Sequence, residues 1–167
     1  PEERADARAQ KRPAVLPGLL SSHSWANDVI YQRIYQLGGT VAPRTASATR
    51  FADFWAQRRA WHDELAPKRS LFGMGYGADT NGFGSQGGPR NPGEGEPAVE
   101  YPFTGFGGVS FDQQVSGNQT YDINTDGVDH YGLYPDWVED LRQLAGDDIV
   151  QDMARGAEGY LLTWERA

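Results

Sequence analysis

The 167-residue sequence contains no cysteine, and this absence excludes several kinds of chemistry at once. Disulfides, thiol nucleophiles and cysteine-ligated zinc sites are all ruled out. A metal ion in this chain must therefore be held by histidine, aspartate, glutamate or backbone oxygens. The absence of cysteine fits the cytosol and the cell exterior equally well, so the compartment stays open.

Long apolar runs and an excess of positive charge are also missing. No apolar run reaches the length of a membrane span, so we expect no transmembrane segment. Lys and Arg number 15 against 23 Asp and Glu, which gives a formal net charge of −8. Nucleic-acid-binding domains carry basic surfaces, so we expect no nucleic-acid partner. The sequence begins with Pro1 rather than Met, from which we expect a processed product or a fragment.

Aromatic residues, by contrast, are plentiful, and the chain is long enough to bury a core. Between residues 14 and 82, segments of strand and helix character alternate. Short apolar runs at 15–22, 40–42 and 70–78 predict buried strands, and apolar residues at helical spacing between these runs predict two helices. This order predicts βαβ units and a parallel sheet.

Cap-forming residues mark the ends of these two helices. Either Asn27 or Asp28 is placed to cap the first helix, and the glycine pair that begins at Gly38 is placed to end it. Either Ser47 or Thr49 is placed to cap a second helix over residues 50–65.

Polar, chemically capable residues follow each of the three predicted strands. They are His23, Arg44 and Asp79. In parallel α/β folds the functional sites form at the carboxyl ends of the strands. The three residues are therefore expected at one edge of the sheet, which makes that edge the first place to look for a site.

Residues 83–126 break the alternation and form a Gly- and Pro-rich, partly β insertion, with candidate strands at 99–103 and 109–114. Insertions of this length are usually functional lids or binding loops. Helices return in residues 127–167. Pro135 sits in the first turn of one helix, and Asp147 or Asp148 begins a last helix. The buried side of that last helix is expected to include Tyr160, Leu161 and Trp164.

Three segments together resemble the renal-type membrane dipeptidase family. GLLSSHS at 18–24 is similar to the sixth barrel strand of that family, with its Ser-His-Ser signature. GYGADTNG at 75–82 resembles the eighth strand, which has a Gly-x-Asp-x-Asp/Asn-Gly pattern. GVDHY at 127–131 and YPDWVEDL at 134–141 are similar to the final barrel helix. The order of these segments and the spacing between them also agree with the family. The resemblance covers most of residues 14–82 and 127–167.

The resemblance implies an α/β fold in which residues 1–167 form the C-terminal part of a (β/α)8 TIM barrel, with strands six to eight and the closing helices. It also implies a binuclear site, normally with two zinc ions, that hydrolyses dipeptides and related amides. His23 corresponds to a metal ligand, and Asp79 to the catalytic residue that handles the proton of the attacking water. The residue types fit, because imidazole binds zinc and a carboxylate beside metal-bound water accepts a proton.

The other ligands of the family's site lie upstream of its sixth strand, and residues 1–22 contain no such set. We therefore expect a second polypeptide that carries barrel strands one to five, because half a barrel would leave sheet edges unpaired. The family's carboxylate-binding arginine is also missing after strand six. Arg44, Arg90 and Asn81 are the candidate residues for binding a small amide or peptide substrate, and holding the turn after the strand is the alternative role of Asn81.

Asp122, Asn124 and Asp126 match the opening of a calcium loop, D-x-N-x-D-G. The twelfth position of that loop is Leu133 in place of the bidentate glutamate. A calcium site and an Asx-rich turn are therefore the two interpretations of this segment, and the turn accounts for the missing glutamate.

Two other functions stay open beside amide hydrolysis. The first is lactone, ester or carbamate hydrolysis on the same scaffold, since the carboxylate-binding loop is missing. The second is a barrel relative without metals that binds a sugar or a protein through the insertion, whose aromatic residues could instead pack it onto the barrel. These aromatic residues are Tyr101, Phe103, Phe106, Phe111 and Tyr121.

Overall fold

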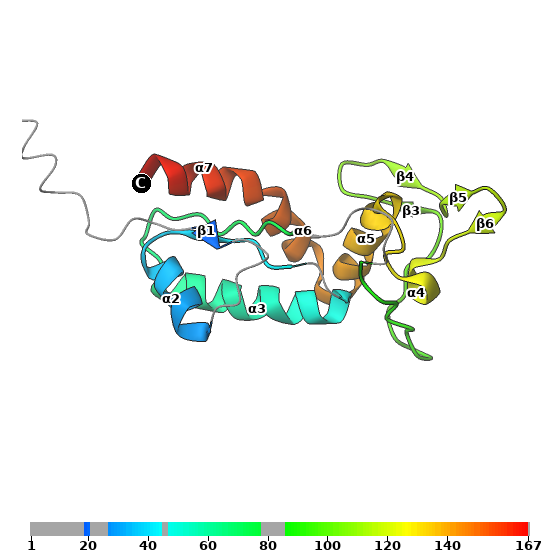
Figure 1. Cartoon of the computed structure of the whole chain (residues 1–167), viewed down its shortest axis with the longest axis horizontal. Helices are drawn as coiled ribbons and strands as arrows, with labels where there is room; N and C mark the ends of the chain where they lie inside the picture. The colour runs from blue at the N-terminus through cyan, green and yellow to red at the C-terminus, as the bar shows by residue number, and fades with distance from the viewer. Residues whose placement is uncertain (1–18, 21–26, 45–46, 78–85, 167) are drawn as a thin grey trace, which may run out of the picture.

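The computed structural model describes residues 19–20, 27–44, 47–77 and 86–166 (Figure 1). Its N-terminal part alternates strands and helices, as the sequence predicted. The elements are β1 (Leu19–Leu20), α2 (Asp28–Gln36), β2 (Thr40–Val41) and α3 (Ala48–Leu65). β1 pairs with β2 in parallel, and two parallel bridges, Val41 with Met74 and Arg44 with Gly77, add a third extended segment beside β2.

Side-chain caps explain where the two crossover helices begin. The Asn27 side chain accepts a hydrogen bond from the Ile30 backbone N–H at 3.2 Å, and the Ser47 hydroxyl accepts one from the Arg50 N–H at 3.5 Å. Gly38 follows α2 with φ 73°, a left-handed conformation that favours glycine. Each of these positions is among those that the sequence predicted.

Helices cover both faces of the three parallel segments (Figure 1). On one face, the Phe72 ring packs against the Tyr35 ring of α2 and the His62 ring of α3, with ring centroids 6.2 and 5.3 Å apart. On the other face, Thr40 Oγ1 lies 2.6 Å from Thr163 Oγ1 of α7 (Gly156–Arg166). Thr40 and Val41 are both buried, and side chains alternate along a strand, so Val41 is expected on the face opposite Thr40.

The C-terminal region holds α5 (Tyr134–Ala145), α6 (Asp147–Ala154) and α7. The prediction of one last helix after Asp147 was wrong, because that helix ends at Ala154 and a new one begins at Gly156. The prediction that Tyr160, Leu161 and Trp164 are buried was also wrong, since they are 47%, 52% and 71% exposed. The physical reason is that the small residues of α7, not the large ones, face the parallel segments.

The insertion forms two short antiparallel hairpins followed by small helical segments. β3 (Phe103–Thr104) pairs with β4 (Ser110–Phe111), and β5 (Val115–Ser116) pairs with β6 (Gln119–Thr120). They are followed by α4 (Ile123–Asp126) and the 3-10 turn η1 (Tyr131–Leu133). An antiparallel bridge between Gly87 and Val128 holds the two ends of the insertion together. The hairpins lie at the end of the molecule opposite the C terminus (Figure 1).

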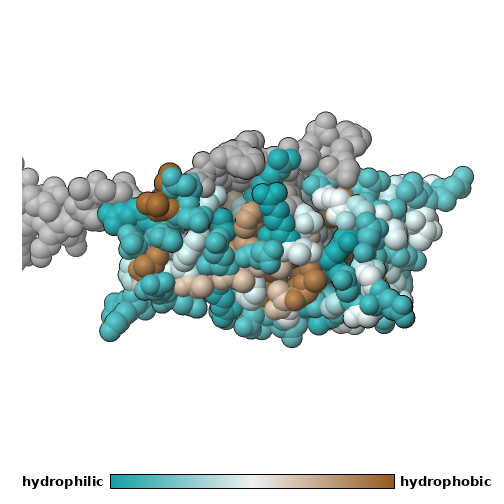
Figure 2. Space-filling view, turned by 90° about the horizontal axis from the view of Figure 1, so that it is seen from below, coloured by the Kyte–Doolittle hydropathy of each residue, from teal (hydrophilic) through white to brown (hydrophobic). Residues whose placement is uncertain are grey.

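One apolar core connects these parts. It includes residues from β2, α3, the insertion and α5, among them Val41, Phe51, Val99, Phe103 and Trp137. Figure 2 shows a face that is mostly hydrophilic, with only separate small apolar patches. No closed barrel is formed within the described residues. Parallel segments joined by crossover helices occur in barrels and in open sheets alike, so the barrel assignment stays a prediction.

Candidate functional site

The parallel register brings the carboxyl ends of three consecutive extended segments to one edge. β1 and β2 run parallel, and Arg44 forms a parallel bridge with Gly77. The Gly77 N–H also donates to the Pro43 carbonyl at 3.1 Å. The exposed Arg44 therefore lies at this edge, as the sequence predicted.

The other strand-end candidates, His23, Asp79 and Asn81, lie outside the described residues. In the sequence His23 comes three positions after Leu20, which ends β1. Asp79 comes two positions after Gly77, the last bridged residue of the third segment. In residues 27–44, 47–77 and 86–166, no group of three or more His, Asp and Glu side chains is arranged to hold a metal ion. A metal site here would therefore need ligands beyond this part of the chain.

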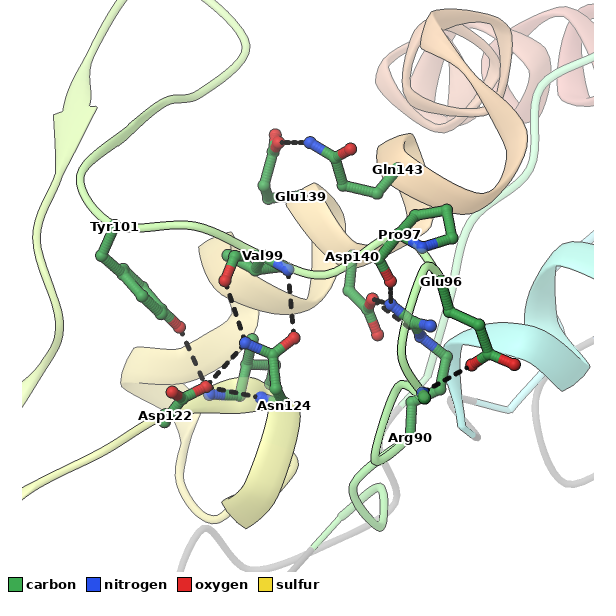
Figure 3. A network of polar contacts seen from close by, with 12 residues as sticks. Arg90, Glu96, Pro97, Val99, Tyr101, Asp122, Asn124, Glu139, Asp140 and Gln143 are labelled. Carbon is green, nitrogen blue, oxygen red and sulfur yellow. Dashed lines mark hydrogen bonds and ion pairs between the residues drawn. The ribbon is translucent and has the colours of Figure 1, made fainter.

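Arg90 is engaged in an ion pair rather than free for a substrate (Figure 3). Its Nε and one terminal nitrogen donate to Asp140 Oδ1 at 3.0 and 2.7 Å, and it also donates to the Pro97 carbonyl. The two charged side chains are only 8% and 7% exposed. This arrangement assigns Arg90 to packing the insertion onto α5.

Asp122 and Asn124 form a capping turn at the start of α4 (Figure 3). Asp122 Oδ1 accepts from the Asn124 backbone N–H at 2.9 Å, and the Asn124 side chain pairs with both the N–H and the carbonyl of Val99. Asp126 Oδ2 accepts from the Asp122 N–H at 2.7 Å. These oxygens already accept backbone hydrogen bonds, so the geometry favours the Asx turn over calcium at this segment.

A cleft lined largely by aromatic side chains lies between α5 and the β3–β4 hairpin. It has a volume of about 270 Å³. Three of the insertion aromatics that the sequence singled out, Phe103, Phe106 and Phe111, contribute to it. Tyr76 and Tyr134 complete the aromatic lining, with their ring centroids 5.6 Å apart. The sequence did not place these two tyrosines at a site, because they meet only in the folded chain.

A paired arginine forms the polar part of this cleft. Arg142 donates twice to the Glu139 carboxylate, at 2.7 and 2.6 Å. These hydrogen bonds raise the pKa of Arg142 above its ordinary range, so it stays charged. Glu139 is itself buried and also accepts from Gln143 at 2.7 Å (Figure 3). This pair was not predicted from the sequence. Its spacing of three residues within a helix is the sequence feature that indicates an ion pair.

A second polar group that the sequence missed lies beneath the insertion. The Tyr101 hydroxyl donates to Asp136 Oδ1 at 2.6 Å, and Asp136 is completely buried. Burial raises the pKa of Asp136, while the Tyr101 hydrogen bond and the nearby His130 act in the opposite direction. Its second oxygen, Oδ2, has no hydrogen-bond partner among the described residues. Asp136 is therefore a carboxyl group that is costly to ionise.

No helix in the described part of the chain is long and apolar enough to cross a membrane. The chain was also compared with models of protein families, with curated proteins and with solved structures, and none of them matches it.

Proposed function

We propose that this chain supplies one side of the active site of a metal-dependent hydrolase that cleaves amide or peptide bonds. The observation that carries the proposal is the parallel register of β1, β2 and the segment ending at Gly77. Arg44 lies at the edge where these segments end, and in the sequence His23 and Asp79 follow the other two segments within three positions. Sites in parallel α/β folds form at such an edge.

Each of the three residues has a distinct proposed role. His23 is a metal ligand, since a neutral imidazole nitrogen binds zinc well. Bound zinc would supply a water molecule whose pKa is lowered to about 7. The Asp79 carboxylate accepts the proton from the attacking water and returns it to the leaving amine. Arg44, exposed at the edge, orients an anionic or carbonyl group of the substrate.

The metal-ligand set that the resemblance implies upstream of His23 is missing from residues 1–22, which supports a second component. Beyond His23, further ligands are required for a binuclear centre. We propose that a second polypeptide supplies them, together with the missing strands. Two zinc ions per complete assembly are the expected cofactor.

The metal content of the chain purified together with its partner tests the proposal. We expect about two divalent ions per assembly, and His23→Ala should lower this by about one ion. Asp79→Asn should keep the metal but lower the rate of amide hydrolysis by about 10²–10⁴-fold. Asp129→Asn, at an exposed position, is the matched control for Asp79→Asn. A metal-free assembly whose activity is unchanged by His23→Ala would rule the proposal out.

The aromatic cleft favours one other candidate function, a binding protein without catalysis. The cleft is lined largely by side chains from the insertion and α5, and it contains no described metal-ligand group. In that case ligand binding would persist in a metal-free protein, and neither Asp79→Asn nor His23→Ala would change it. The same metal analysis therefore separates the two candidates.

A further inference from the structure

Three adjoining cavities meet at Arg142. The aromatic cleft of about 270 Å³ is the first, and cavities of about 290 and 520 Å³ share Arg142 with it. We call the three together the Arg142 cleft. Ligand sites in proteins usually have volumes of roughly 300–1,000 Å³, so the cleft is large enough for a small molecule.

Aromatic rings provide the apolar part of the Arg142 cleft. Phe103 and Phe111 are stacked with their ring centroids 5.3 Å apart, and Tyr76 and Tyr134 lie 5.6 Å apart. Phe106 is 67% exposed where the β3–β4 hairpin turns, beside the cleft. Aromatic faces arranged in this way attract other rings and also cations.

The charges around the cleft are unequal. Four carboxylates contribute to its lining, those of Glu96, Glu100, Glu139 and Asp147, against the single guanidinium of Arg142. Arg142 is already paired with Glu139 at 2.6 Å and lies 3.5 Å from Asp147. The cleft is therefore net negative, so it attracts cationic groups and repels free carboxylates.

The cleft adjoins the strand-end edge where the proposed chemistry takes place. Tyr76, which lines the cleft, immediately precedes Gly77, the last bridged residue of the third parallel segment. Asp79 follows only two positions after Gly77 in the sequence. Along the chain, the cleft-lining Tyr76 and the proposed catalytic residue Asp79 are therefore three positions apart.

We propose that the Arg142 cleft binds an aromatic group that carries a cationic amine, as in the amino-terminal aromatic residue of an amide substrate. The aromatic rings hold the apolar group, and the carboxylate excess holds the amine. The identification of this ligand as a substrate rests on the proposed hydrolase function. The binding preference itself follows from the cleft and is testable without catalysis.

The test measures equilibrium binding of three probes to the full chain by calorimetry. Phenylalaninamide combines a ring with an amine cation, N-acetylphenylalanine carries a carboxylate, and glucose is neutral. We expect phenylalaninamide to bind at least about tenfold more tightly than either other probe. Equal or tighter binding of N-acetylphenylalanine or of glucose would overturn the proposal.

Two variants locate the binding. Phe106→Ala should weaken phenylalaninamide binding by about three- to tenfold, since one aromatic contact is lost. Asp147→Asn, at an exposed position, should weaken it by about twofold and reduce its dependence on salt. Trp164→Ala and Asp53→Asn change an exposed aromatic residue and an exposed carboxylate outside the cleft, and should leave binding unchanged. Unchanged binding in both cleft variants would place the ligand elsewhere and refute the assignment.

The two proposals fail in different ways. If phenylalaninamide binds as described but the complete assembly does not hydrolyse amides, the cleft assignment stands and the hydrolase proposal falls. If the assembly hydrolyses alanine and phenylalanine amides equally well, and Phe106→Ala changes neither rate, the hydrolase proposal stands and the identification of the cleft ligand as its substrate falls.

Discussion

Arg90 and Asp140 form an ion pair that water scarcely reaches, and it connects the insertion to α5. The two residues are 50 positions apart in the sequence. Nothing local to Arg90 indicates its partner, so the sequence left it as a candidate to replace the missing carboxylate-binding arginine. The pairing shows how a charged residue near a predicted site can serve the fold instead.

Arg90→Ala should destabilise the chain, because it leaves the Asp140 carboxylate buried without its partner. Breaking a buried ion pair costs about 3–5 kcal/mol of unfolding free energy. Urea unfolding measures this loss, and the double variant with Asp140→Ala should recover part of it. Arg33→Ala, at an exposed position on α2, is the control and should change stability by less than about 0.5 kcal/mol. A stable Arg90→Ala chain with weakened substrate binding would instead favour the original prediction.

Asp136 predicts a measurable dependence of stability on pH. Its pKa in the folded chain is raised above the ordinary value of 3.8, chiefly by burial, with Asp122 nearby adding to the effect. The folded chain therefore holds this proton more tightly than the unfolded chain, so its stability is higher below pH 3.8 and falls as pH rises through the raised pKa. Asp136→Asn removes this titration. Chemical unfolding from pH 3 to 8 measures the unfolding free energy of both chains. The value for the variant minus that for the natural chain should increase with pH and then level off. A difference that does not change with pH would contradict the raised pKa of Asp136.

At the scale of elements, the local sequence determines the crossover helices well. Asn27 and Ser47 act as caps because their side chains accept hydrogen bonds from nearby backbone N–H groups. The break between α6 and α7 was not predicted, because the spacing of apolar residues continues across it. The position of the break follows from a contact between distant segments, since glycines of α7 approach the backbone of the segment around Gly73. Periodicity cannot show such a contact.

Gly73→Ala should weaken the packing of α7 against the parallel segments. A Cβ atom at Gly73 would lie 2.4 Å from the Arg155 carbonyl oxygen, so the backbone must move. Overpacking of this kind costs about 1–3 kcal/mol. Gly88→Ala is the control, since a Cβ there meets nothing within 4 Å. Thermal unfolding compares the two variants, and equal midpoints would show that α7 does not pack as described.

Across the whole molecule, the candidate site was only partly predictable. His23 and Asp79 follow from strand ends and from a resemblance, and Arg44 indeed lies at the shared edge. The Arg142 cleft could not be predicted, because its walls come from Tyr76, from residues 96–100, from the β3–β4 hairpin and from the helices α5 and α6. Long-range packing brings these segments together, and no local pattern encodes their distances.

The bridge between Gly87 and Val128 has a consequence for how such a protein can change over time. It returns the chain to nearly the point from which the insertion departs. A segment closed in this way can be lengthened or shortened at its exposed hairpins while the parallel segments keep their register, because loop length affects closure entropy only weakly. Under the proposed function, ligand preference would then change through the exposed hairpin residues, while the strand-end residues stay the same.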